Sequence, residues 1–256
     1  MLLPFFVSAY TYPDEAHDTR ECVILLHGIF TTGMRMSRLH RRLHKEGYTV
    51  VSISYPTRAI RMRAIAEHIE PMIAGYRARH SRMHIVGYSM GGLIARLYLA
   101  RQDAVVVDSL VCIGTPNKGT EFIDLIRQMS WIKRLFAFVG GPSGNELGSA
   151  READSVVHEL GTNAPAGVAT GIIAGRARWS PASKLPQPHD GYVPVENCTL
   201  DGMQDCMIVP YGHIHLPFRR EVTNAVVTFL QTRSFDAEKK EIYKKTDHGS
   251  KKEKRI

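Results

Sequence analysis

The sequence contains few of the residues that hold disulfide-rich or membrane-spanning proteins together. Its 256 residues include only 4 cysteines and 2 tryptophans. No uncharged apolar run approaches the roughly 20 residues that a membrane helix needs. The cysteines lack the spacing of a metal site, and they stand at Cys22, Cys112, Cys198 and Cys206. A chain of this length buries roughly three quarters of its unfolded surface, so it can fold without disulfides or metals.

Two features bear on the compartment in which the protein works. Cys198 and Cys206 can pair in an oxidising compartment, but nothing else in the sequence favours a bridge. Residues 2–9 are apolar but short, with no Lys or Arg before them, so a first strand or a frayed end is the favoured interpretation. We therefore expect a cytoplasmic protein, and the alternative is an exported one in which residues 1–9 belong to a signal.

Acidic residues are scarce between positions 35 and 101, where 13 Lys or Arg stand against 3 Glu, and the whole chain carries a net charge of +8. Four of these cations fall on one face of a predicted helix, at Arg35, Arg38, Arg42 and Lys45. No nucleic-acid-binding module accompanies them, and aromatic residues are not interleaved with them. We therefore expect no nucleic-acid partner, whereas weak association with an anionic membrane surface is compatible with this charge.

Short apolar runs alternate with segments of helical periodicity along most of the chain. The predicted strands are nearly continuous apolar runs, as in strands buried on both faces, at residues 22–26, 49–54, 83–86, 110–113, 171–174 and 207–209. Helical apolar faces lie between most of them. The pattern predicts an α/β fold, with a sheet of about six mostly parallel strands and helices on both faces.

The same alternation divides the chain into three parts. Residues 1–21 are an N-terminal extension, residues 22–235 the α/β domain, and residues 236–256 a basic, polar tail that we expect to be disordered. A long stretch at about residues 120–169 interrupts the alternation and is predicted to be a helical, lid-like insertion.

The residues Gly87-Tyr88-Ser89-Met90-Gly91-Gly92 follow a predicted strand and precede a predicted helix. In this context a G-x-S-x-G sequence forms a nucleophile elbow, because glycines allow the tight turn that exposes the serine hydroxyl. The alternative is a glycine-rich turn with an incidental serine. The context favours Ser89 as a nucleophile at the positive end of a helix.

A serine needs a base to accept its proton and a carboxylate to orient that base. In this type of sheet the acid follows the next-to-last strand and the histidine follows the last. The residues in these places are Asp190, and either His213 or His215, while Asp201 and Asp205 are rival acids.

An oxyanion hole needs two positioned N–H groups. We assign them to Met90, directly after the serine, and to Ile29, in the loop that follows the first core strand. In that loop His27 is expected to brace the backbone rather than to take part in chemistry.

These residues together resemble the α/β-hydrolase superfamily, and within it the bacterial lipase-like and esterase-like serine hydrolases. The resemblance runs from about residue 22 to residue 235. It rests on the elbow and on five further segments, Leu25-Leu-His-Gly28, Tyr55-Pro-Thr-Arg58, Gly114-Thr-Pro-Asn-Lys-Gly119, Gly141-Pro-Ser-Gly-Asn-Glu-Leu-Gly148 and Asp190-Gly-Tyr-Val-Pro-Val195. It implies a minimal α/β-hydrolase fold whose early antiparallel strands are missing or reduced.

The resemblance also implies a triad of Ser89, Asp190 and His213. In members of this superfamily that the sequence resembles, the catalytic histidine stands three residues before an aliphatic residue and nine before a valine. The resemblance therefore favours His213, with Leu216 and Val222 at these places, over His215. The sequence thus predicts a carboxylic ester hydrolase that works through an acyl-enzyme on a small-molecule ester, without a metal or organic cofactor. The alternatives are an acyltransferase or thioesterase with the same triad and, less favoured, a non-catalytic binding protein; the oligomeric state is not predicted.

Apolar residues in the insertion are candidates for substrate binding, namely Trp131, Leu135, Phe136 and Phe138. An insertion at this place leaves the sheet near the carboxyl ends of its strands, beside Ser89. We therefore expect a preference for acyl chains longer than acetyl. The alternative is that these side chains pack inward as the core of the lid.

Overall fold

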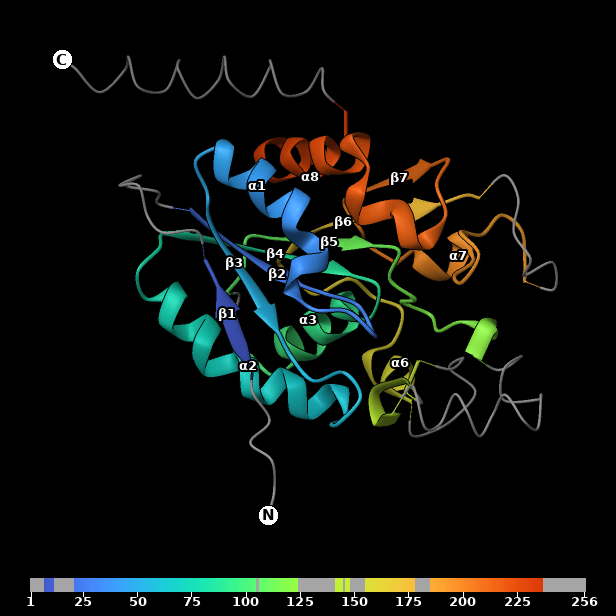
Figure 1. Cartoon of the computed structure of the whole chain (residues 1–256), viewed down its shortest axis with the longest axis horizontal. Coiled ribbons are helices and arrows are strands. Elements are labelled where there is room, and N and C mark those ends of the chain that lie inside the picture. Colours follow the sequence, from blue (N-terminus) through green and yellow to red (C-terminus); the bar gives the residue numbers. More distant parts are fainter. Residues whose placement is uncertain are drawn as a thin grey trace.

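The computed structural model describes residues 7–11, 21–104, 106–123, 141–144, 146–147, 155–177 and 185–236. A seven-stranded sheet forms its centre, in the order β1-β3-β2-β4-β5-β6-β7 (Figure 1). The strands are β1 (Ser8–Tyr10), β2 (Glu21–Leu26), β3 (Thr49–Ser54), β4 (Arg82–Tyr88), β5 (Ser109–Ile113), β6 (Ala169–Gly175) and β7 (Asp205–Val209). All neighbouring pairs are parallel except β1 and β3, which are antiparallel.

The predicted α/β-hydrolase fold is confirmed, and each of the six predicted apolar runs forms a strand. In the predicted N-terminal extension, where a first strand or a frayed end was expected at residues 2–9, the structure has strand β1, which pairs Ala9 with Ile53 at the edge of the sheet. Within the described part of the N-terminal segment, the early antiparallel strand consists of the three residues of β1.

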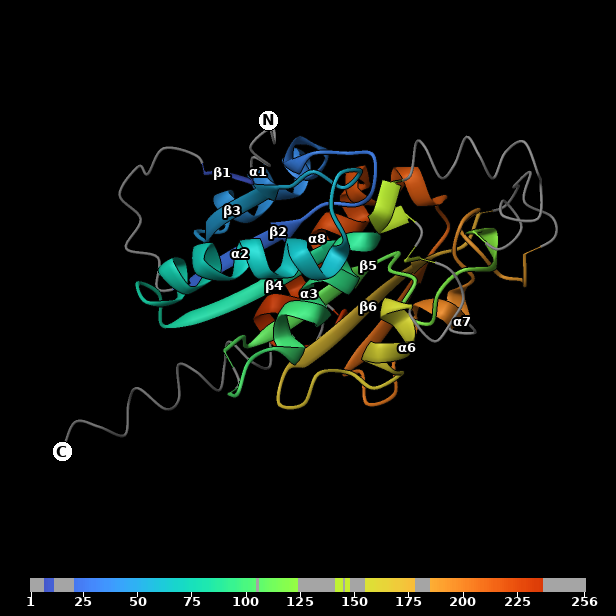
Figure 2. The same cartoon turned by 90° about the horizontal axis from the view of Figure 1, so that it is seen from below.

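Helices cover both faces of the sheet, as Figure 2 shows. One face carries α1 (Ser37–Lys45) and α8 (Arg220–Thr232). The other face carries α2 (Met62–Arg77), α3 (Met90–Ala100) and α6 (Val156–Leu160). Shorter helical turns are η1 (Gly33–Met36), α7 (Val195–Cys198) and η2 (His213–Phe218).

Alternation along each strand divides the core into two layers. In β2, Ile24 packs against α2 and α3, whereas its neighbour Leu25 packs on the side of α1 and α8, and both are fully buried. Successive side chains of a strand point to opposite faces, so a sheet covered on both sides needs an apolar residue at every position. This requirement explains the continuous apolar runs of the sequence.

Parallel strands bring the loops that follow β2, β4, β6 and β7 to one edge of the sheet, where sites in such folds are built. All four cysteines are unpaired, including Cys198 and Cys206. Within the described ranges no helix is long and apolar enough to cross a membrane. The predicted tail beyond Asp236 and about half of the predicted insertion lie outside the described residues.

Candidate active site

Ser89 occupies the sharp turn between β4 and α3. Its backbone has φ 54° and ψ −123°, a region that a residue with a side chain rarely adopts. The turn is possible because its neighbours are glycines: a Cβ on Gly87 would lie 2.4 Å from the nitrogen of Gly92, and one on Gly91 would lie 2.2 Å from the carbonyl oxygen of Leu26. The local sequence thus holds the Ser89 hydroxyl at the N-terminus of α3.

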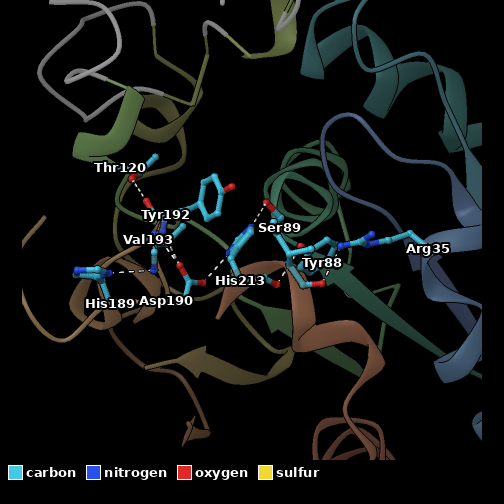
Figure 3. Close-up of polar contacts among 11 residues, drawn as sticks. Arg35, Tyr88, Ser89, Thr120, His189, Asp190, Tyr192, Val193 and His213 are labelled. Atoms are coloured by element: carbon cyan, nitrogen blue, oxygen red, sulfur yellow. Dashed lines mark hydrogen bonds and ion pairs between the residues drawn. The ribbon is translucent and has the colours of Figure 1, made fainter. Parts of the chain in front are cut away.

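The side chains of His213 and Asp190 meet Ser89 in a continuous line of hydrogen bonds (Figure 3). His213 Nε2 lies 3.0 Å from Ser89 Oγ. On the other side of the ring, His213 Nδ1 lies 2.6 Å from Asp190 Oδ2. All three residues are buried, with 7%, 8% and 2% of Ser89, His213 and Asp190 exposed.

The loops that carry the acid and the base are also joined through their backbones. The His213 N–H donates to the carbonyl oxygen of Asp190 at 2.9 Å, and the Tyr88 hydroxyl donates to the carbonyl oxygen of His213 at 3.1 Å. Asp190 Oδ1 accepts the N–H groups of Tyr192 at 3.0 Å and Val193 at 2.8 Å. These hydrogen bonds fix the orientation of the His213 imidazole relative to the Asp190 carboxylate.

The rival candidates of the sequence have other partners. Asp201 Oδ2 accepts a hydrogen bond from the Thr162 hydroxyl at 2.8 Å. Asp205 begins β7, at the opposite end of the strand from His213, and accepts the Ser234 hydroxyl at 2.8 Å. His215 is exposed. Of these candidates, the structure brings only Asp190 and His213 to Ser89.

The loop after β2 comes very close to the nucleophile. A Cβ on Gly28 would lie 3.0 Å from Ser89 Cβ and 3.2 Å from the Tyr88 ring, so glycine at this position allows the approach. The approach carries Ile29 to the pocket beside Ser89. Met90 is the first residue of α3. Among the described residues, neither the N–H of Met90 nor that of Ile29 donates to a backbone carbonyl oxygen in a turn, loop or cap. Both N–H groups are thus candidates for binding an oxyanion.

His27, which directly follows β2, stabilises this loop through contacts with Tyr55 and Gly28. Its ring stacks on Tyr55 with centroids 4.0 Å apart, Nε2 accepts the Tyr55 N–H at 3.2 Å, and Nδ1 lies 2.8 Å from the Gly28 carbonyl oxygen. Burial lowers the pKa of His27 from 6.5 to about 4, so the ring is neutral near pH 7. The bracing role expected from the sequence agrees with these contacts.

The neutral ring predicts a loss of stability in acid. The unfolded chain takes up a proton near pH 6.5, whereas the folded chain does so only near pH 4, so the free energy of unfolding falls as the pH drops between these values. We expect His27→Gln to reduce this slope by up to one proton, about 1.4 kcal/mol per pH unit. Urea titrations from pH 4 to pH 7 measure the slope.

The matched control is Tyr55→Phe, which removes the bond from the Tyr55 hydroxyl to the His27 carbonyl oxygen but keeps the imidazole. It should lower stability at every pH and leave the slope unchanged. An unchanged slope in His27→Gln would contradict the prediction.

A pocket of about 310 Å³ opens beside the Ser89 and His213 side chains. Its walls are mostly apolar and are formed by Ile29, Phe30, Pro116, Phe122, Ile123, Leu147, Val193 and Ile214. Tyr192 closes one side, with its ring 5.2 Å from that of His213 and 4.8 Å from that of Phe122. Such an apolar pocket next to a few convergent polar groups is typical of a small-molecule site.

The substrate-binding residues predicted from the sequence, Trp131, Leu135, Phe136 and Phe138, lie outside the described residues. The pocket walls that sequence analysis missed include Phe122 and Ile123, from the start of the predicted insertion, and Leu147, from its middle. The available signal was their position close to Gly119 and within the Gly141–Gly148 motif, which marks the segments but not the side chains that line the pocket.

A serine at a strand–helix elbow, with a histidine and a carboxylate from later loops of the same parallel sheet, defines an α/β-hydrolase-superfamily serine hydrolase. The resemblance inferred from the sequence motifs is thereby confirmed. Within this class, the chain belongs to the palmitoyl protein thioesterase family, whose family model matches residues 22–150. The matched segment includes Ile29, Ser89 and Met90, and it ends before Asp190 and His213.

Solved structures share the fold at low sequence identity. The mature lipase BlEst2 of Bacillus licheniformis is 17% identical, with a TM-score of 0.65, over 87% of this chain and 96% of that one. A thermophilic esterase from Thermogutta terrifontis is 16% identical, with a TM-score of 0.60, over 89% and 93%. The type II thioesterase BorB of the borrelidin biosynthetic cluster is 16% identical, with a TM-score of 0.53, over 86% and 94%. A search of curated proteins found no match.

Proposed function

We propose that the protein hydrolyses acyl esters through a covalent acyl-enzyme formed on Ser89. The observation that carries the proposal is the hydrogen-bonded line from Ser89 Oγ through His213 to the buried Asp190 carboxylate. A serine hydroxyl is a weak nucleophile until a neighbouring base accepts its proton, and His213 Nε2 is within hydrogen-bond reach at 3.0 Å.

In the first half of the reaction, Ser89 Oγ attacks the acyl carbonyl while His213 Nε2 accepts the hydroxyl proton. Asp190 holds the ring so that Nδ1 carries a hydrogen and Nε2 is free to accept one. The imidazolium then gives its proton to the leaving alcohol, and the acyl group stays on Ser89. In the second half, His213 activates a water molecule that releases the acid and restores the serine.

The negative charge that develops on the carbonyl oxygen needs donors already in place. We assign this role to the N–H groups of Ile29 and Met90. Met90 lies at the N-terminus of α3, where the helix dipole adds to the effect. Gly28 permits the Ile29 side of the hole to approach Ser89.

The acyl chain is assigned to the apolar pocket beside Ser89. Its volume of about 310 Å³ is at the low end of small-molecule sites, which favours acyl chains longer than acetyl but of limited length. Thioester cleavage is the second candidate, because the family to which the chain belongs is described as palmitoyl protein thioesterases. The same residues serve both reactions, since only the leaving group differs.

The proposal predicts how the rate depends on acyl length. Each methylene buried in the pocket contributes about 0.8 kcal/mol, so kcat/KM should rise about fourfold per methylene beyond acetyl until the pocket is full. Phe122→Ser places a hydroxyl in the wall and should flatten this rise more than it lowers activity on acetyl esters. The measurement is kcat/KM for p-nitrophenyl esters of two to twelve carbons and for thioesters of the same acids.

The control is Ile208→Ser, which removes an apolar side chain that is 51% exposed and does not line the pocket. It should leave the profile unchanged. A dependence of kcat/KM on acyl length that peaks at acetyl in the wild type and in both variants would refute the acyl pocket. If the wild type hydrolysed neither the esters nor the thioesters, the proposed function would be refuted.

A further inference from the structure

A groove of about 560 Å³ between α1 and α8 concentrates positive charge outside the active site. It is lined by Arg38, Arg41, Arg42, Lys45, Arg220, Thr223 and Asn224. The four cations of α1 form one stripe, on the side opposite the buried Leu39 and Leu43. The two helices lie side by side (Figure 1), and Arg42 Nε donates to Asn224 Oδ1 across them at 3.0 Å.

Some cations on the other face of the sheet have acidic partners, whereas most of those in the groove do not. Arg63 pairs with Glu159 at 2.5 Å, and Arg101 pairs with Glu67 and Glu70 at 3.3 and 3.2 Å. In the groove, Arg42 pairs with Glu46. Among the residues that the structure describes, no ion pair involves the other cations, Arg38, Arg41, Lys45 and Arg220. The groove therefore presents a net positive charge to solvent.

Arg38 and Arg220 also stand in the first turns of α1 and α8. The positive end of a helix dipole disfavours a cation in that position. The helix dipole therefore does not account for Arg38 and Arg220 at these positions.

The basic groove adjoins an apolar rim at the mouth of the active-site pocket. The turn η1 leads directly into α1, and its Arg35 lines the pocket and donates to the Ile214 carbonyl oxygen at 2.7 Å. Phe30 and Ile214 line the pocket and are 49% and 47% exposed, and Met34, which precedes Arg35 in η1, is 81% exposed. Several large exposed apolar side chains close to cations without ion pairs are unusual on a surface that faces only water.

We propose that this face, the groove between α1 and α8 together with the rim of Phe30, Met34 and Ile214, docks on a membrane that contains anionic phospholipids. The guanidinium groups contact lipid phosphates, which they match in charge and geometry. The rim residues enter the boundary between headgroups and acyl chains. Docking in this orientation turns the mouth of the pocket toward the bilayer.

The test measures binding without catalysis, so its result does not depend on the proposed function. The protein carries Ser89→Ala and is sedimented with vesicles of phosphatidylcholine alone or with 30% phosphatidylglycerol. We expect binding to the anionic vesicles only, and release at 0.5 M NaCl, where the screening length falls to a few ångströms. Arg38→Gln with Arg41→Gln should lower the partition coefficient about 30-fold, the equivalent of about 1 kcal/mol for each cation.

The matched control is Arg77→Gln with Arg79→Gln, which removes the same charge from the end of α2 on the opposite face of the sheet. It should change the partition coefficient less than twofold, and thermal melting by circular dichroism should show that both double variants are folded. Equal losses in the two variants would overturn the proposal in favour of attraction by net charge alone. Equal binding to both vesicle types would also overturn it. So would selective release by inorganic phosphate at matched ionic strength, which would assign the groove to a soluble phosphate ligand.

Discussion

Replacing Ser89 by alanine should lower kcat for ester hydrolysis by a factor on the order of 10⁴ or more, while the fold is kept. The reason is that, among the described residues, Ser89 Oγ is the only hydroxyl that is hydrogen-bonded to His213 Nε2. Alanine keeps the Cβ of the turn and removes only the reacting oxygen. The measurement is the steady-state rate on a p-nitrophenyl ester, with circular dichroism to show that the variant is folded.

A fluorophosphonate probe gives an independent readout of the same residue. It should modify Ser89 and no other serine, as peptide mass spectrometry would show, and labelling should vanish in Ser89→Ala. Ser37→Ala is the matched control, because Ser37 is exposed at the start of α1 and should be dispensable. Hydrolysis by Ser89→Ala at the wild-type rate would refute the serine mechanism.

The second large effect is expected at His213. His213→Ala should be nearly as damaging as Ser89→Ala, because the nucleophile and its base act as one unit, and the double variant should be little worse than either single one. His215→Ala should retain most of the activity, because His215 is exposed while His213 Nε2 lies 3.0 Å from Ser89 Oγ. Steady-state kinetics of these four variants and of the wild type measure the differences.

The comparison of the two histidines is also the control for folding, since they stand on the same turn, η2. A severe loss in His215→Ala together with a mild one in His213→Ala would assign the base to His215 instead.

The central strands could be predicted from the sequence because burial on both faces demands an uninterrupted apolar run. Residues 49–54 illustrate this, since the predicted and observed strand β3 have the same bounds. The bounds of strand β1 could not be found in this way, since residues 2–9 predicted only a first strand or a frayed end. The three residues of β1 are exposed and its antiparallel partner β3 lies about 40 residues further along the chain, so no local pattern marks where β1 begins and ends. The four-residue α7 likewise has too few positions for a helical period.

In the site, likewise, some residues could be predicted from the sequence and others could not. The positions of Ser89, Asp190 and His213 could be predicted because the order of strands fixes which loops reach the nucleophile, and the structure brings these three side chains together. The pocket walls could not, because Phe30, Phe122 and Leu147 come from separate loops and meet only through the tertiary fold. Their apolar character has no periodicity that would distinguish a pocket wall from a core residue.

The close contact of Gly28 with the elbow determines whether the proposed oxyanion hole exists before substrate binds or forms only on binding. The β2 loop rests on Ser89 and is braced by His27 and Tyr55, so the Ile29 and Met90 donors are in place before any substrate arrives. Little reorganisation energy is then left for substrate binding to supply. Hydrolysis of a dissolved ester should therefore reach its full rate without a lag, and any faster turnover on anionic vesicles would reflect a higher local concentration of enzyme rather than a rearranged hole.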